Sequence, residues 1–304
     1  MSMQDCEAVR PKGFPLLSSD RKAAGIPFRV SRSKAGIFSL SRNELFAGLA
    51  ALAFLNGISE RIAMAVRENG VPAALMSTFD ISIIVWAACG IGLSFLLRDP
   101  PQPVSRADRV VAALALAALL LPVVPISWLA LSGLTVYIVK SSAPSSFMHR
   151  GAWILLAMTV PMLWGRLLFA VFSDAILRGD AALVGWLVGT PRIGNAIQFA
   201  DGSGYLWIAP ACSSLANVSL AVLCWVTLAK VENRPSSWRD AGWILAAACA
   251  VIAVNVVRIG LLGLYRESFE TLHGPVGATI ASLLILVLTV AICQIGIRHA
   301  PARA

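Results

Sequence analysis

Long apolar stretches alternate with short polar segments along most of the chain. Crossing a hydrocarbon core of ~30 Å takes about 20 helical residues, and most of these stretches reach or approach that length. The pattern therefore predicts an all-α, polytopic integral membrane helical bundle with about eight transmembrane helices. The stretches cover residues 43–58, 77–97, 109–122, 124–140, 151–172, 205–229, 241–264 and 275–297.

The early part of this count leaves alternatives open. The first stretch is short and contains Asn56, and only the corner from Pro122 to Pro125 separates the third stretch from the fourth, so six or seven spans also fit. Residues 181–188 form an apolar run that is too short to span. We expect this run to lie at the membrane interface, within a long loop over residues 173–204.

The segment that precedes the first stretch is basic and poor in apolar residues. It combines eight Lys and Arg residues with Ser, Pro and Gly, and such a composition cannot bury a core. We therefore predict a disordered cytoplasmic tail over residues 1–42 and a multi-span membrane domain over residues 43–300.

The distribution of the 25 Lys and Arg residues predicts the topology. With eight spans and the N-terminus inside, 18 of them fall on the cytoplasmic side, six fall on the opposite side, and Arg166 lies within the fifth stretch. The positive-inside rule then places both termini in the cytoplasm of a multi-pass cell-membrane protein. The same asymmetry explains the net charge of +9, so we expect the lipid bilayer, and not nucleic acid, as a partner.

The cysteines indicate neither a disulfide framework nor a metal site, and we expect no cofactor. They are scattered, with no C-x-x-C pair and no Cys/His cluster at zinc-ligand spacing. The six are Cys6, Cys89, Cys212, Cys224, Cys249 and Cys293.

Three residues with complementary chemistry converge on the extracytoplasmic side in this topology. Cys212 is expected about two turns into the sixth stretch, Arg258 near the end of the seventh, and His273 at the start of the eighth. A thiol in apolar surroundings keeps its proton, so nucleophilic attack requires a base such as His273. The positive charge of Arg258 favours the thiolate and could stabilise an oxyanion.

Neighbouring polar residues could support this chemistry. Asn255 lies on the same helix face as Arg258, three positions earlier, where its amide could orient the guanidinium or accept a substrate group. Ser213 and Ser214 follow the cysteine as short hydrogen-bond donors, although Ser in a membrane helix more often bonds to its own backbone. Taken singly, each of these residues has a structural interpretation too, because buried Cys is mostly inert packing and interfacial His is usually structural.

The order of these residues resembles that of the exosortase/archaeosortase family. The sequence APACSS at 209–214, the N-x-x-R motif NVVRI at 255–259 and the pair LH at 272–273 are similar to the three signature blocks of that family. The resemblance covers roughly residues 150–297, which would hold the catalytic part. Ser214 stands where Gly is more common in the first block.

The resemblance implies an integral-membrane cysteine transpeptidase with Cys212 as nucleophile, His273 as acid and base, and Arg258 as electrostatic stabiliser. The implied substrate is a membrane-anchored exported protein whose C-terminus carries a short motif, a transmembrane helix and a basic cluster. Such an enzyme cleaves near the motif on the extracytoplasmic side and passes the acyl group to an acceptor. A peptidase of the same architecture, which releases the product to water, remains an alternative.

Arg166 is the other charge expected inside the membrane, where an unpaired charge is costly. It could pair with Asp174, two turns further along the chain, or contact the substrate. If Arg166 and Arg258 lined a passage for an anionic substrate, the chain would instead be a transporter or an envelope-assembly scaffold. The related halves with Gly- or Pro-broken helices that this alternative favours are not apparent in the sequence.

Overall fold

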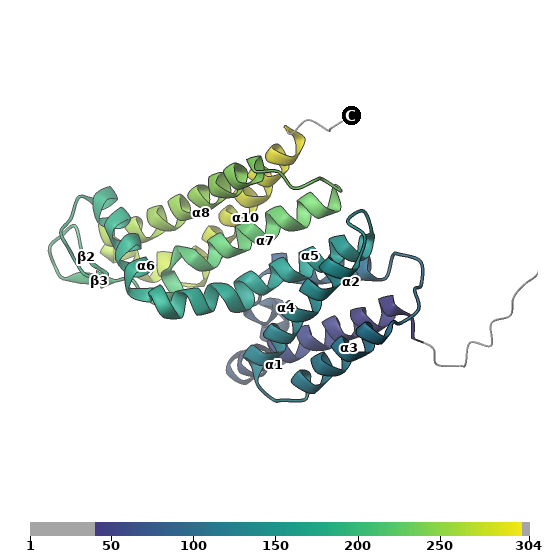
Figure 1. The fold of residues 1–304 in the computed structure, drawn as a ribbon. Helices are drawn as coiled ribbons and strands as arrows, with labels where there is room; N and C mark the ends of the chain where they lie inside the picture. Colours follow the sequence, from purple (N-terminus) through teal and green to yellow (C-terminus); the bar gives the residue numbers. More distant parts are fainter. Residues whose placement is uncertain (1–39, 300–304) are drawn as a thin grey trace, which may run out of the picture. The chain divides into compact units, whose positions relative to one another are not determined.

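The computed structural model describes residues 40–299, so most of the predicted tail lies outside the described residues. Within this range the chain is mostly helical, as predicted, and a small antiparallel sheet interrupts the helices (Figure 1). Six helices of the described range are long and apolar enough to cross a membrane. They are α1 (Arg42–Met76), α4 (Val124–Ser141), the continuous helix from α5 through α6 (Phe147–Val188), α7 (Ser214–Val231), α8 (Arg239–Leu264) and α10 (Pro275–Arg298).

By length and hydropathy, six of the eight predicted spans qualify as membrane-spanning helices. The second and third predicted spans form α2 (Ile83–Leu96) and α3 (Arg106–Leu119), which have 14 residues each. At 1.5 Å per residue each helix is about 21 Å long, which is short of the ~30 Å of a bilayer core. Ser82 caps α2 and begins it six residues later than the apolar pattern suggested, whereas Ser105 caps α3 and begins it three residues earlier.

The loop predicted over residues 173–204 is mostly wrong, because α6 (Gly165–Val188) continues through its first half. Leu177, Ala181 and Val184 are buried, and their spacing of four and three residues is that of one helix face. Gly189, with a φ of 76°, ends the helix in the left-handed conformation that favours glycine. Before α6, the helix from α5 (Phe147–Thr159) passes through a π-helical segment, η2 (Val160–Trp164).

The remainder of that loop is a three-stranded antiparallel sheet. Its strands are β1 (Arg192–Ile193), β2 (Ala196–Gln198) and β3 (Tyr205–Trp207), in the order β1-β2-β3. The start of the predicted sixth span is therefore strand β3 followed by a 3-10 turn, η3 (Pro210–Cys212), and α7 begins only at Ser214. The expectation that Cys212 lies two turns inside a membrane helix is wrong.

The C-terminal half packs α7, α8 and α10 side by side (Figure 1). Two short elements, η4 (Arg266–Ser268) and α9 (Phe269–His273), connect α8 to α10. His273 thus ends α9, and the last span opens two residues later. The N-terminal half packs α1 against α4 and α5 against α2, with the 3-10 turn η1 (Thr78–Asp80) between α1 and α2.

Two hydrogen bonds show which of the connecting segments lie at each end of the C-terminal helices. The Ala200 N–H donates to the Gly263 carbonyl at 3.1 Å, which holds the sheet against the C-terminal end of α8. At the other end, the Arg234 Nη1 donates to the Gly296 carbonyl at 2.9 Å, which ties the α7–α8 loop to the end of α10. The segment around Cys212 and the α7–α8 loop therefore lie at opposite ends of α7.

A buried ion pair fixes the start of α1 to α3. The Arg42 Nε lies 3.0 Å from Asp108 Oδ1, and the two side chains are only 7% and 3% exposed. Tyr137 Oη also donates to this carboxylate, at 2.9 Å. Burial alone would raise the pKa of Asp108, but the hydrogen bonds from Ser105, Arg42 and Tyr137 outweigh it and lower the pKa to about 2.

Replacing Asp108 by Asn is expected to destabilise the protein by about 3 kcal/mol, because it leaves the Arg42 guanidinium buried without its counter-charge. The measurement is the apparent melting temperature of the purified protein in detergent, which should fall by several degrees. The folded-state pKa of Asp108 is depressed, so its contribution is complete above about pH 4 and is lost as the pH falls toward 2. The difference in melting temperature between the wild type and Asp108→Asn should therefore become smaller as the pH falls toward 2.

The control is Asp174→Asn, which removes an exposed ion pair between Asp174 and Arg178. Exposed pairs contribute about 0–1 kcal/mol, so this variant should melt close to the wild type. Equal melting temperatures for the two variants would contradict the role of the buried pair.

Candidate active site

Cys212 lies in the junction between the sheet and α7. Pro210 opens the 3-10 turn that carries it, and the Cys212 N–H donates to the Ala209 carbonyl at 2.9 Å. Its side chain is half-buried and packs on an apolar cluster that includes Ile208 and, from α8, Ile259. The thiol therefore lies between the sheet and α8, at the start of a membrane-spanning helix.

The two serines that follow Cys212 build the N-terminus of α7. Ser213 is the N-cap residue, and its Oγ accepts from the Leu215 N–H at 3.3 Å. Ser214 donates through its N–H to Asp180 Oδ2 at 3.2 Å and through its Oγ to Asp180 Oδ1 at 2.9 Å. Both serines are buried, so the structure gives them a role in holding the helix start.

Asn255 links α8 directly to the cysteine. Its Nδ2 donates to the Cys212 carbonyl at 2.7 Å and to the Ser214 Oγ at 3.0 Å. The side chain is buried, and these two acceptors satisfy both of its N–H donors. Asn255, which is 43 residues from Cys212 in the sequence, thus forms one hydrogen-bonded group with Cys212 and Ser214.

Asp180 completes this group, and sequence reasoning missed it. Its carboxylate is 6% exposed and accepts both hydrogen bonds from Ser214 at the N-terminal end of α7, where the helix dipole favours a negative charge. The sequence does carry a signal for it. Asp180 falls on the same helical face as Leu177, Ala181 and Val184, and an acid on a buried face requires a specific partner.

Arg258 lies one turn beyond Asn255 on the same face of α8. Its side chain is partly buried, and its Nε is a buried donor without a hydrogen-bond partner in the described part of the chain. Val256, two positions before it, and Ile259, directly after it, belong to the same apolar cluster on which Cys212 packs. A free guanidinium donor is therefore held at the helix face that contacts the cysteine segment.

His273 lies at the same end of the bundle as Arg258. It is exposed at the end of α9, and α9 packs against α8 and α10. The structure thus joins Cys212 to Asn255 and Ser214 by hydrogen bonds, whereas it places Arg258 on the adjoining helix face and His273 on the connection beyond it.

Arg166 lies away from this group. It is near the start of α6, 14 residues before Asp180, which is about 21 Å along the helix axis. It lines a cavity of about 270 Å³ together with Glu60 and Trp128. The expected pairing with Asp174 is wrong, because Asp174 binds Arg178 instead, with Arg178 Nε 2.9 Å from its Oδ1.

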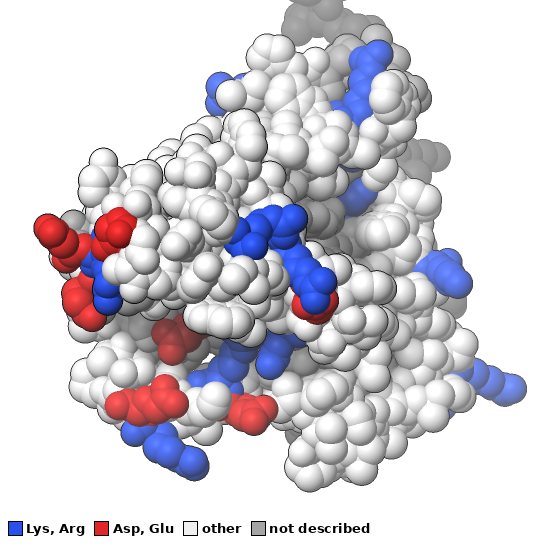
Figure 2. Space-filling view, turned by 90° about the vertical axis from the view of Figure 1, so that its left-hand side faces the viewer, with Lys and Arg blue, Asp and Glu red and all other residues white. Residues whose placement is uncertain are grey.

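The surface at this end carries both positive and negative side chains, with neither sign dominating (Figure 2). Figure 2 looks onto the side of the molecule where the sheet lies, and charged side chains of both signs are separated there by uncharged surface. Such a face does not steer a strongly charged soluble molecule from a distance. Among residues 40–299, no three His, Cys, Asp or Glu side chains gather where they could hold a metal ion.

Comparison with known proteins gave one family. Residues 180–290 match the model of the transmembrane exosortase family, EpsH type, which confirms the resemblance predicted from the sequence. The match begins at Asp180 and includes Cys212, Asn255, Arg258 and His273. No curated protein and no solved structure matches the chain.

Replacing Asp180 by Ala is expected to release the turn that holds Cys212 and so to speed its alkylation. Two hydrogen bonds to a buried carboxylate are lost, and a loss of about 2 kcal/mol in local stability allows up to ~30-fold faster labelling of a half-buried thiol. The measurement is the alkylation rate in a protein whose other cysteines are replaced by Ala.

The matched control is Asp174→Ala, which removes an exposed acid from the same helix. Its labelling rate should stay within about twofold of the parent. Equal acceleration by both substitutions would show that Asp180 does not hold the cysteine segment.

Proposed function

Because residues 180–290 match a family of membrane transpeptidases that process sorting signals, we propose that this chain is an integral-membrane cysteine transpeptidase or peptidase. Its substrates are membrane-anchored exported proteins with a C-terminal motif, a transmembrane helix and a basic cluster. It cleaves these sorting tags on the extracytoplasmic side and transfers the product to an acceptor. Cys212 is the nucleophile, His273 the acid and base, and Arg258 the electrostatic stabiliser.

The observation that carries this proposal is the buried Nε of Arg258 beside the cysteine segment, which has no hydrogen-bond partner in the part of the chain that the structure describes. A buried donor without an acceptor costs about 1–3 kcal/mol, and an oxyanion would recover that cost. A donor that finds its partner only when charge develops on the substrate favours the transition state over the resting state. A purely structural arginine would be expected to use this donor within the fold.

The chemistry follows from these roles. His273 accepts the thiol proton of Cys212, and the sulfur attacks the carbonyl carbon of the scissile peptide bond. The guanidinium of Arg258 stabilises the negative charge that develops on the carbonyl oxygen. Collapse of the tetrahedral intermediate breaks the C–N bond, and His273 returns the proton to the departing amine. The resulting thioester is resolved by an amine or hydroxyl acceptor, or by water, and the thiol is regenerated.

Strand β3 offers a way to present the substrate. Its register with β2 pairs Leu206 with Ile197, and the hydrogen bonds from Phe199 N–H to Gly204 O and from Ile208 N–H to Asn195 O flank this pair. By alternation, the N–H and C=O groups of Tyr205 and Trp207 point away from β2, to the open edge. This edge leads into Cys212 within five residues, so an extended substrate motif that pairs with it would reach the thiol.

The central test is to express the protein with a tagged membrane-anchored substrate and to follow processing by gel mobility and mass. Cys212→Ala should abolish processing, Arg258→Ala should slow it by roughly 100-fold or more, and His273→Ala should slow it by a similar factor. Cys249→Ala and Arg266→Ala are the controls, because neither residue belongs to the proposed site. Unchanged processing in Cys212→Ala would exclude cysteine catalysis and favour the transporter or scaffold alternative.

Trp207→Pro tests the role of the β3 edge. Proline removes the outward N–H but none of the hydrogen bonds that join β3 to β2, so it should slow processing by about tenfold. Trp207→Ala retains the N–H and is the control for loss of the exposed indole. Equal processing by the two variants would contradict strand pairing with the substrate and leave the catalytic assignment intact.

A further inference from the structure

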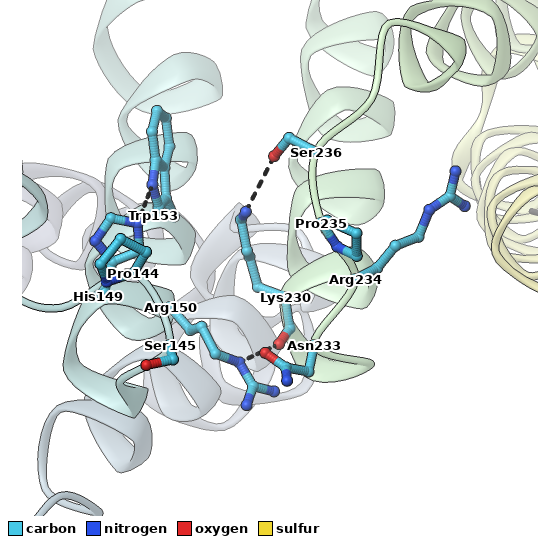
Figure 3. Close-up of a pocket in the computed structure, with 10 residues that line it drawn as sticks. All are labelled: Pro144, Ser145, His149, Arg150, Trp153, Lys230, Asn233, Arg234, Pro235 and Ser236. Carbon is cyan, nitrogen blue, oxygen red and sulfur yellow. Dashed lines mark hydrogen bonds between the residues drawn. The ribbon is translucent and has the colours of Figure 1, made fainter. Parts of the chain in front are cut away.

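A cavity of about 410 Å³ lies at the end of α7 that is remote from Cys212. The α4–α5 loop forms one wall through Pro144 and Ser145, and the α7–α8 loop forms the other through Asn233 and Ser236 (Figure 3). Since α7 has 18 residues, the cavity lies about 27 Å from the cysteine segment along the helix axis. It therefore has no part in the chemistry proposed above.

The lining is basic, and no carboxylate belongs to it among the residues that the structure describes. Four of its residues can carry positive charge or donate strongly, but their hydrogen bonds separate them into two groups. The four are His149, Arg150, Lys230 and Arg234.

Two of these residues are already committed elsewhere. His149 uses both ring nitrogens, since Nδ1 lies 3.0 Å from the Val139 carbonyl and Nε2 accepts from Trp153 at 3.1 Å. Arg234 points away from the cavity (Figure 3), and its Nη2 is paired with Asp240 at 2.8 Å. The Arg234 guanidinium is thus directed away from the cavity (Figure 3), and both ring nitrogens of His149 are already in use.

Lys230 and Arg150 do have donors to spare. The Lys230 ammonium gives one hydrogen bond, to Ser236 Oγ at 3.2 Å, and it has three protons to donate. Arg150 donates through Nε and Nη2 to the carbonyls of Lys230 and Val231, at 2.7 Å each, while its Nη1 has no hydrogen-bond partner among residues 40–299. These contacts also hold the Arg150 guanidinium in place at the cavity wall.

Neutral donors complete the lining. Asn233, with its amide, and Ser145 and Ser236, with their hydroxyls, line the same cavity. A group with three or four acceptor oxygens and a negative charge matches this set better than a carboxylate, which has only two oxygens. The volume leaves room for a substituent, and Trp153 adds an apolar wall on the side of the membrane-spanning helices.

We infer that this cavity binds the phosphate group of a small anionic ligand or of a lipid headgroup, with Lys230 and Arg150 as its cationic contacts. Basic pockets between transmembrane helices are suited to anionic headgroups. The helices that form the cavity, α5 and α7, are both candidate spans, so a lipid phosphate reaches this depth without leaving the bilayer.

The test titrates the full-length protein in detergent, by calorimetry, with three probes: dihexanoyl phosphatidic acid, dihexanoyl phosphatidylcholine and inorganic phosphate. Lys230→Gln should weaken phosphatidic acid binding by about tenfold or more, because a charged hydrogen bond is lost. Lys230→Arg keeps the charge and should bind within about threefold of the wild type. Lys140→Gln is the matched control, since this exposed lysine lies in the last turn of α4, outside the cavity, and its replacement should leave binding unchanged.

The probes distinguish the source of the phosphate. Saturable binding of phosphatidic acid without competition by inorganic phosphate identifies a lipid headgroup, whereas equally tight binding of inorganic phosphate identifies a soluble phosphate ligand. The inference is overturned if neither anionic probe binds, if the zwitterionic lipid binds as tightly as phosphatidic acid, or if Lys230→Gln binds like Lys140→Gln. None of these results depends on cleavage activity.

Discussion

The buried hydrogen bonds at the N-terminus of α7 decide where the cysteine lies. A helix start leaves several backbone N–H groups unsatisfied, and water is not available to satisfy them inside a packed bundle. Here the Asp180 carboxylate accepts the Ser214 N–H and Oγ, while Asn255 binds the Cys212 carbonyl and the same serine. α6, α7 and α8 are thereby tied at one point, and Cys212 cannot move without breaking a buried polar contact.

The bilayer explains why this point lies at the end of the spans. Irregular backbone is tolerated at membrane depth only where protein satisfies its polar groups, so the sheet, the 3-10 turn and the short helix α9 all occur between spans. A thiol on a mid-helix face would meet a substrate only through side chains. A thiol on a turn that follows β3 adjoins an open strand edge, which offers backbone hydrogen bonds to an extended peptide.

The sequence was sufficient for the helical membrane class and for bringing residues 212, 255 and 258 together, because hydropathy and helical spacing are local properties. It was insufficient for the length of α6, because Asp174, Arg178 and Asp180 are polar enough to resemble a loop. The helix is held by its buried apolar face of Leu177, Ala181 and Val184. Asp174 and Arg178 form an exposed i,i+4 ion pair on it, and Asp180 binds the start of α7. The short strands were missed as well, since a strand of three residues such as β3 leaves little periodicity to read.

Asp180 also determines which group can supply positive electrostatic potential at the candidate site. The N-terminus of a helix carries a partial positive charge that could stabilise an oxyanion, but at α7 a buried carboxylate already accepts from its first N–H, that of Ser214. The helix dipole is therefore largely compensated where the cysteine lies. In the proposed mechanism, a transition state with negative charge on oxygen draws on a side chain instead. We propose Arg258 for this role, because its Nε has no hydrogen-bond partner among residues 40–299 and lies on the helix face that Asn255 holds against Cys212.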